Sequence, residues 1–253
     1  MNNDPRLDPR CDDLGYSLRR YFVDCFYHRE SAGIPEGSTL LDLGGTRVAK
    51  RGYFAIENLP LKVVSANCSP AAAPDVIAVA EELPFVDGTF DAVICSELLE
   101  HVYSPARVID EVRRVMVPGG ILLITVPFLV GIHADPGDYG RYTEQFWRKL
   151  LAEKGFELQR LERQGAFWSV VCDLLRIFAV SLRRDGLFGR VAVRLFCQAL
   201  RVGRKRALAF ESAGREEEGR FRSGFTTGYG IVARKKLPHE ALWRQGVNTD
   251  SKE

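Results

Sequence analysis

Residues 39–45 of the chain read Thr-Leu-Leu-Asp-Leu-Gly-Gly. An apolar run that contains Asp42 and continues into Gly44 and Gly45 is typical of a strand followed by a glycine turn. Glycines at this place let the main chain and its N–H groups lie close to a bound ligand. The same pattern also occurs in turns that bind nothing. On these residues alone, a cofactor loop and a plain turn both remain open interpretations.

The remaining apolar runs predict a parallel sheet covered by helices. Short runs rich in branched residues follow the first one, at residues 62–66, 75–79, 90–95, 121–126, 156–161 and 226–234. Stretches with apolar residues at helical spacing separate most of them, which is typical of α/β architecture. An amphipathic helix over 14–30 precedes the first strand. Another helix begins after a Ser104 cap and is expected to end at Pro118, and a third follows Thr143.

Residues 166–206 differ in kind from the rest of the chain. They predict two helices, 168–184 and 187–206, and carry nine basic residues against two acidic ones. One interpretation is an insertion that packs on the core and exposes a basic face. The other is contact with a membrane surface, because large apolar side chains alternate with arginines along both helices.

The composition narrows the function classes. The 253 residues carry 35 basic and 33 acidic side chains, a net charge of +2 that does not favour a general nucleic-acid binder. The six cysteines form no CxxC pair, and His133 with Asp135 are too few for a metal site. The polar first residues do not resemble a signal peptide. We expect a cytoplasmic protein, in contact with membranes at most peripherally, with tails at 1–13 and 237–253 around a domain at 14–236.

A series of short motifs follows the glycine turn. In order these are AEELPF at 80–85, FDAV at 90–93, LEHV at 99–102, Glu111 with Arg114-Val115, and PGG at 118–120. Their order and spacing closely resemble the type 11 group of class I S-adenosylmethionine (SAM)-dependent methyltransferases, over residues 40–165. The resemblance implies a doubly wound, Rossmann-like sheet of seven strands whose last strand is antiparallel, with the 166–206 helices inserted before that strand.

The resemblance also implies a cofactor, SAM, and the residues that contact it. Asp42, Gly44 and Gly45 would surround its methionine part, and Asn67 would face the ribose hydroxyls. Ala80 and Glu81 would border the adenine, while Ser96 and Glu97 would line the site near the methyl group.

Four positions depart from the family pattern. Thr46 and Val48 stand where family members commonly have further glycines, and Asn67 and Val79 replace acids. Each lost hydrogen bond to the cofactor would weaken binding by about 1–3 kcal/mol. An active methyltransferase is the interpretation we favour. The alternative is a non-catalytic descendant of the fold that serves as a binding or scaffold protein.

The acceptor side is expected in the polar stretch after the run 121–126. Candidates for proton transfer or acceptor binding are His101, His133, Asp135, Tyr139, Arg141 and Tyr142. Arg141 is suited to an anionic group, because its planar guanidinium matches carboxylates and phosphates. The IHADPxDYxRYT-like loop is similar to a subgroup found beside glycan-assembly enzymes, which implies a small-molecule or glycan-type acceptor, free or lipid-linked. An RNA acceptor would use the basic helices, but no RNA-binding motif accompanies them. Neither the atom methylated nor the oligomeric state follows from the sequence.

Overall fold

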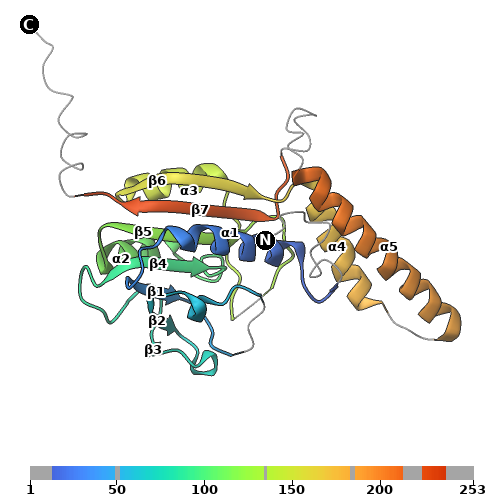
Figure 1. The fold of residues 1–253 in the computed structure, drawn as a ribbon, viewed down its shortest axis with the longest axis horizontal. Coiled ribbons are helices and arrows are strands. Elements are labelled where there is room, and N and C mark those ends of the chain that lie inside the picture. The colour runs from blue at the N-terminus through green and yellow to red at the C-terminus, as the bar shows by residue number, and fades with distance from the viewer. Residues whose placement is uncertain (1–12, 49–51, 134–135, 183–185, 213–223, 238–253) are drawn as a thin grey trace, which may run out of the picture.

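A single seven-stranded sheet organises the molecule. The computed structural model describes residues 13–48, 52–133, 136–182, 186–212 and 224–237. The strand order is β3-β2-β1-β4-β5-β7-β6 (Figure 1), with β1 (Thr39–Leu43), β2 (Lys62–Asn67), β3 (Val76–Ile77), β4 (Phe90–Ser96), β5 (Met116–Pro127), β6 (Phe156–Gln164) and β7 (Gly228–Lys235). Strands β1 to β5 pair in parallel, and β7 is antiparallel to both neighbours. The predicted seven-stranded fold and its antiparallel last strand are confirmed.

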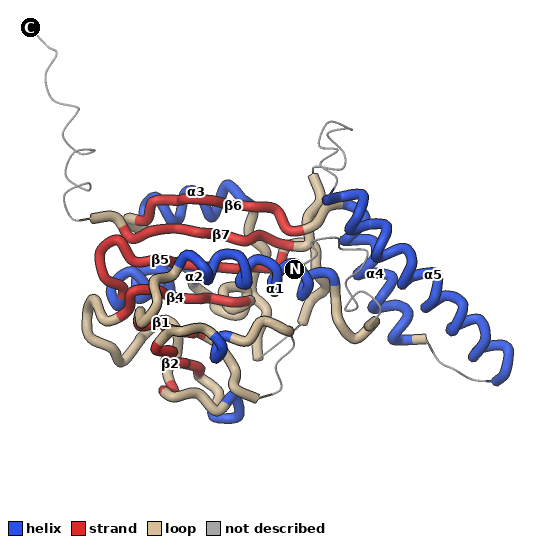
Figure 2. The backbone as a smooth tube through the Cα atoms, viewed as in Figure 1, coloured by secondary structure: helices blue, strands red, loops and turns tan. Residues whose placement is uncertain are grey.

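Alternation along the central strands fills a core on each face of the sheet. Leu41 and Leu43 of β1 point to the face covered by α2 (Pro105–Val115) and α3 (Glu144–Glu153), where Trp147 is fully buried. Leu40 points to the other face, which α1 (Leu18–Glu30) covers (Figure 2). The period of two along a strand thus places helices on both sides of the sheet.

Strands and α-helices alternate along the chain only from β4 onward, where α2 lies between β4 and β5 and α3 between β5 and β6. In the described part of the chain, only the short 3-10 turns η4 (Ile56–Asn58) and η5 (Pro70–Ala72) lie between β1 and β3. The predicted strand 75–79 is reduced to the two residues of β3, because only these pair with β2.

The predicted ends of α2 also need correction. The Ser104 side chain makes no capping hydrogen bond, although Pro105 does occupy the first turn. The Pro118 to Gly120 segment does not end the helix, which stops at Val115; it lies within β5 instead. The β4–β5 register shifts at this point, and Gly119 has φ +79°, so an irregular strand accommodates the proline and the glycines.

The 166–206 insertion forms a helical hairpin of α4 (Phe167–Ser181) and α5 (Gly186–Ser212), longer at its end than the sequence predicts. Figure 1 shows it extending beyond the end of the sheet toward which the parallel strands run. Its buried stripe packs against α1, with Leu18, Cys172 and Leu208 in one cluster. The Asp173 carboxylate accepts hydrogen bonds from the N–H groups of Leu18 and Arg19, both at 2.8 Å, and so caps α1. No helix in the described ranges is long and apolar enough to cross a membrane.

Candidate functional site

A cleft of about 720 Å³ opens where β1, β2 and β4 end. In open α/β sheets, ligands bind at the carboxyl ends of the strands, at the point where the strand order reverses. Here β1 and β4 are neighbours, while the chain runs outward from β1 to β2 and β3. All the residues that the sequence analysis assigns to the cofactor line this cleft: Asp42, Gly44, Gly45, Asn67, Ala80, Glu81, Ser96 and Glu97.

The glycine turn after β1 depends on both of its glycines. Gly44 has φ +82°, a conformation that side chains other than glycine rarely adopt. A Cβ on Gly45 would lie 1.8 Å from Oδ2 of Asp42, so the carboxylate occupies the space that a side chain would need. The turn therefore brings bare main chain and an acidic group to the same wall of the cleft.

Asn67, at the end of β2, is tied to this turn. Its Nδ2 donates to the carbonyl oxygens of Gly44 and Gly45, both at 3.0 Å, and its Oδ1 accepts from the Ser69 N–H at 2.9 Å. The side chain lines the cleft, as expected of a residue near the ribose, but both ends of its amide are engaged by protein. Asn67 thus braces the turn, a contact that the sequence did not reveal.

Helix α1 contributes a wall that the sequence analysis missed. Arg20, Asp24 and Tyr27 line the cleft and follow the i, i+4, i+7 spacing that puts residues on one helix face. Asp24 is buried and accepts hydrogen bonds from the Tyr16 hydroxyl at 2.5 Å and the Tyr53 N–H at 2.7 Å. Burial raises the pKa of the Tyr27 hydroxyl, which donates to the Cys95 carbonyl at 3.2 Å and stays neutral. The available signal was the spacing of these three residues, which puts them on one face of an amphipathic helix.

Glu97 combines strained backbone with a buried ion pair. Its φ of +51° is unusual for a residue with a side chain and comes directly after β4. Arg19 donates from Nε to its carboxylate at 3.0 Å and from NH1 to Oε1 of Gln164 at 2.5 Å. Burial acts to raise the pKa of Glu97, but the charge and hydrogen bonds of Arg19 outweigh it and hold that pKa below its ordinary value. Glu97 is therefore an ionised anchor for α1.

Three residues near the mouth of the cleft form a compact group. Glu100 is 2% exposed, and neither carboxylate oxygen has a hydrogen-bond partner among the described residues. Burial, with the nearby charge of Glu97, raises the pKa of Glu100 to about 8. The His101 and His133 rings meet edge to face, with centroids 5.1 Å apart, and both side chains line the cleft. The two histidines are predicted from the sequence as candidates for proton transfer, whereas Glu100 is not.

The loop after β5 places the other predicted acceptor residues differently. Tyr139 lines the cleft and is 58% exposed. Arg141 does not line it; its guanidinium pairs with the Asp138 carboxylate, and these hydrogen bonds hold the pKa of Asp138 at about 2. The arginine that the sequence assigned to an anionic ligand thus already has an anionic partner in the protein. The Tyr142 ring stacks on the Phe146 ring with their centroids 4.2 Å apart, and both rings are partly buried against the core. Asp135 lies outside the described residues.

Comparison with known proteins agrees with this geometry. Residues 42–124 match the family model described as a methyltransferase domain. This segment belongs to the type 11 methyltransferase family. The matched range runs from the acid of the glycine turn to β5, so it contains every cofactor residue assigned from the sequence.

Relatives of the methyltransferase domain extend the comparison over parts of the chain. An uncharacterized methyltransferase of Mycobacterium sp. (strain JLS) is 33% identical over 105 residues, which cover 38% of this chain and 42% of that protein. A demethylmenaquinone methyltransferase of Bacillus velezensis is 28% identical over 152 residues, 59% of this chain and 58% of that protein. The chain thus matches about half the length of these relatives.

The fold extends further than the sequence similarity. The crystal structure of the (4+2)-cyclase SpnF superposes with a TM-score of 0.56 at 20% identity, covering 86% of this chain and 81% of that one. Since that protein is named for a cyclisation, the shared fold does not by itself identify a reaction.

Proposed function

We propose that this chain is a SAM-dependent methyltransferase that binds SAM in the cleft at the ends of β1, β2 and β4. The observation that carries the proposal is the convergence of all eight predicted cofactor residues on one cleft inside the methyltransferase domain. The volume of about 720 Å³ lies within the range of about 300–1,000 Å³ that is typical of small-molecule sites.

The residues present fit this cofactor. The glycine turn presents main chain without side chains, and Asp42 provides an anionic oxygen beside it. Val79 is 52% exposed and lines the cleft with Ala80 and Glu81, so this edge is open to a flat ring. SAM supplies a methyl group on a sulfonium, which is already activated, so the protein has to orient the acceptor and exclude water.

The acceptor would approach from the mouth of the cleft, where His101, His133 and Tyr139 lie. His101 Nδ1 is 2.5 Å from the Gly137 carbonyl, which can only accept, so Nδ1 carries the proton and Nε2 is left as a base. A base at this place can remove the proton that an oxygen or nitrogen acceptor loses on methylation. We propose a small-molecule or lipid-linked acceptor; a glycan group on it remains a prediction from the loop sequence.

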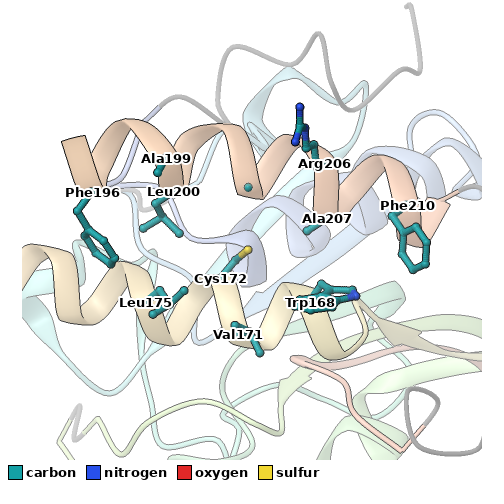
Figure 3. Close-up of a pocket in the computed structure, with 11 residues that line it drawn as sticks. Trp168, Val171, Cys172, Leu175, Phe196, Ala199, Leu200, Arg206, Ala207 and Phe210 are labelled. Carbon is teal, nitrogen blue, oxygen red and sulfur yellow. The ribbon is translucent and has the colours of Figure 1, made fainter. Parts of the chain in front are cut away.

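The helical hairpin favours a lipid-linked acceptor and peripheral contact with a membrane. Its face turned away from α1 exposes Leu174, Ile177 and Phe178, each 47% exposed or more, and the exposed Arg190 and Arg194 follow on α5. A groove of about 600 Å³ between α4 and α5 is lined almost entirely by apolar side chains (Figure 3). Apolar groups among arginines suit an anionic lipid surface. The relative from Bacillus velezensis is named for demethylmenaquinone.

The competing proposal is a binding protein that has lost catalysis. The observation in its favour is that Asn67 uses its amide on the glycine turn, where an acid could face the ribose. Titration calorimetry with SAM and S-adenosylhomocysteine decides first: no heat of binding at millimolar SAM would reject the enzyme.

If SAM binds, turnover decides between the two proposals. Tyr139→Phe should leave SAM affinity unchanged and slow methyl transfer to any acceptor that contacts the hydroxyl. Val86→Phe, at an exposed position outside the cleft, is the control. SAM binding without methyl transfer to any member of a panel of phenol, quinol and amine acceptors would favour the binding protein.

A further inference from the structure

We propose that Glu100, His101 and His133 form a binding site for a divalent transition-metal ion at the mouth of the cleft. Each residue offers one ligand atom, and the three atoms lie within 4.8 Å of one another. Two imidazole nitrogens and one carboxylate oxygen are a ligand set that Zn²⁺ and Fe²⁺ accept in proteins. The proposal rests on these side chains and does not require that the chain bind SAM.

Glu100 supplies the independent observation that points to a ligand. The side chain is 1% exposed, and its two oxygens are without hydrogen-bond partners among the described residues. Buried polar groups in proteins are nearly always paired. Nε2 of His101 lies 3.6 Å from Oε1 of Glu100, which is too long for a hydrogen bond. A cation between these groups would give the carboxylate its missing partner.

The two histidines are held so that a lone pair stays available. His101 donates from Nδ1 to the Gly137 carbonyl at 2.5 Å, which leaves Nε2 unprotonated on the side of Glu100. His133 Nδ1 lies 3.0 Å from the Gly131 carbonyl, which likewise assigns its proton to Nδ1. Metal-binding histidines typically have this arrangement, with the second nitrogen bonded to a carbonyl or carboxylate.

The surroundings also fix the position of His133 and offset the nearest positive charge. The Asp138 carboxylate accepts from the His133 N–H at 2.9 Å. Arg141 NH2 lies 3.5 Å from His133 Nδ1, but its guanidinium is paired with Asp138. The Tyr139 N–H donates to the Glu100 carbonyl at 2.7 Å and joins the loop to the turn after β4. Three protein ligands would leave coordination positions open, and both histidines face the cleft. A metal on Nε2 of His101 would take the lone pair that the metal-free chain offers as a base, so the two roles of this nitrogen exclude each other.

Cobalt(II) is the probe for this site, because its visible absorption reports the ligands. The full chain, stripped with a chelator, is titrated with Co²⁺ and then with competing Zn²⁺. We expect saturable one-to-one binding, with His133→Ala and Glu100→Gln each weakening it at least tenfold. His28→Ala removes an exposed histidine outside the cluster and should change nothing. Cys68→Ser tests the exposed thiol that also lines the cleft; a thiolate charge-transfer band lost in this variant would assign the metal to Cys68 and overturn the proposal.

The remaining outcomes are equally decisive. Circular dichroism checks that each variant folds; since His133 is 37% exposed on a loop, its alanine variant should do so even if Glu100→Gln does not. Binding that is unchanged in the His133 variant, or lost in His28→Ala, would show an adventitious surface site only. No saturation at millimolar Co²⁺ would also reject the site. The titration contains no SAM, so its failure leaves the proposed methyl transfer to be judged by calorimetry.

Discussion

Among single residues, Asn67 and Val79 both stand where the family pattern has an acid, but the two side chains are placed differently in the cleft. Asn67 is engaged at both ends of its amide, while Val79 is half exposed and faces open space. A departure from the family pattern is therefore compensated inside the protein at one position and left open at the other. Gly44 is not a useful probe of ligand contact, because its φ of +82° would make any branched residue strain the backbone.

Restoring the acid at position 67 should harm this chain. Asn67→Asp replaces two donated hydrogen bonds with a carboxylate facing the Gly44 and Gly45 carbonyl oxygens. We expect a loss of about 1–3 kcal/mol in the free energy of unfolding, because the carbonyls lose a donor and meet a negative charge. Urea unfolding measures it, with the exposed Asn58→Asp as the control for added charge. A variant as stable as the wild type, with tighter SAM binding, would contradict this account of Asn67.

Restoring the acid at position 79 should have the opposite effect. Val79→Asp places a charged acceptor at an exposed position that lines the cleft, so the fold should be preserved. If the adenine amino group lies there, one added hydrogen bond should tighten SAM binding by about 1 kcal/mol, or roughly fivefold. Calorimetry compares it with Val86→Asp, an exposed position outside the cleft. Equal affinity in both variants would show that the adenine does not reach residue 79.

At the scale of elements, the Glu111 and Arg114 motif has a structural task. Both side chains leave α2 and hold the segment before β4: Glu111 accepts from the Leu83 N–H at 2.8 Å. Arg114 donates to the carbonyls of Leu83 and Phe85 at 2.8 and 2.7 Å. This segment follows Ala80 and Glu81 of the cleft, so α2 fixes one wall of the site without touching the ligand space. The resemblance thus mixes residues of the site with residues that support it.

The support should weaken in acid. Hydrogen bonds from Arg114 lower the pKa of Glu111, so its contribution to stability is complete above the unfolded value of about 4.3 and is lost as pH falls through the lower folded value. Arg114→Ala should cost about 1–3 kcal/mol at pH 7, and less against wild type below pH 4. Urea unfolding across pH tests this. Arg113→Ala, exposed on the same helix, should stay within about 0.5 kcal/mol of wild type. If the difference in free energy of unfolding between Arg114→Ala and wild type is the same at every pH, the Glu111 carboxylate does not contribute to it.

Elements were more predictable from the sequence than the site was. Apolar runs and glycines located β1 to the residue, because burial on both faces dictates its composition. Contacts between segments that are far apart in the chain have no comparable pattern in the sequence. The spacing of Arg20, Asp24 and Tyr27 shows a common face but not which part of the sheet it meets. The sequence also does not show that the Glu100 carboxylate lacks a hydrogen-bond partner among the described residues, or that Arg141 is already paired with Asp138. Both follow only from how the molecule packs.

At the scale of the whole molecule, the hairpin is joined to the cleft through α1. Asp173 of α4 caps α1 at its start, and one turn of this helix carries both Arg19, bound to Glu97, and Arg20, which lines the cleft. The hairpin extends beyond the same end of the sheet at which the cleft opens (Figure 1). A membrane bound by the hairpin would therefore lie on the side from which an acceptor enters.

Binding to lipid vesicles tests this arrangement. The full chain should sediment with vesicles that contain phosphatidylserine, and less with phosphatidylcholine alone or at high salt, because each arginine near an anionic surface contributes about 1 kcal/mol. Ile177→Asp should weaken vesicle binding about tenfold or more. It removes one apolar side chain that would enter the membrane, and burying such a side chain contributes about 1.5–3 kcal/mol. The variant should lose about 1 kcal/mol in the free energy of unfolding, because aspartate is a poor helix former and the isoleucine is 47% exposed, so circular dichroism must show that it still folds. Val86→Asp makes the same change of polarity at 78% exposure, away from the hairpin, and should bind vesicles as wild type does. Two results would contradict this arrangement: Ile177→Asp binds vesicles as wild type does, or the wild type is a dimer that this variant dissociates. Either result would assign the apolar surface of the hairpin to protein contacts. The acceptor would then have to be sought among water-soluble molecules.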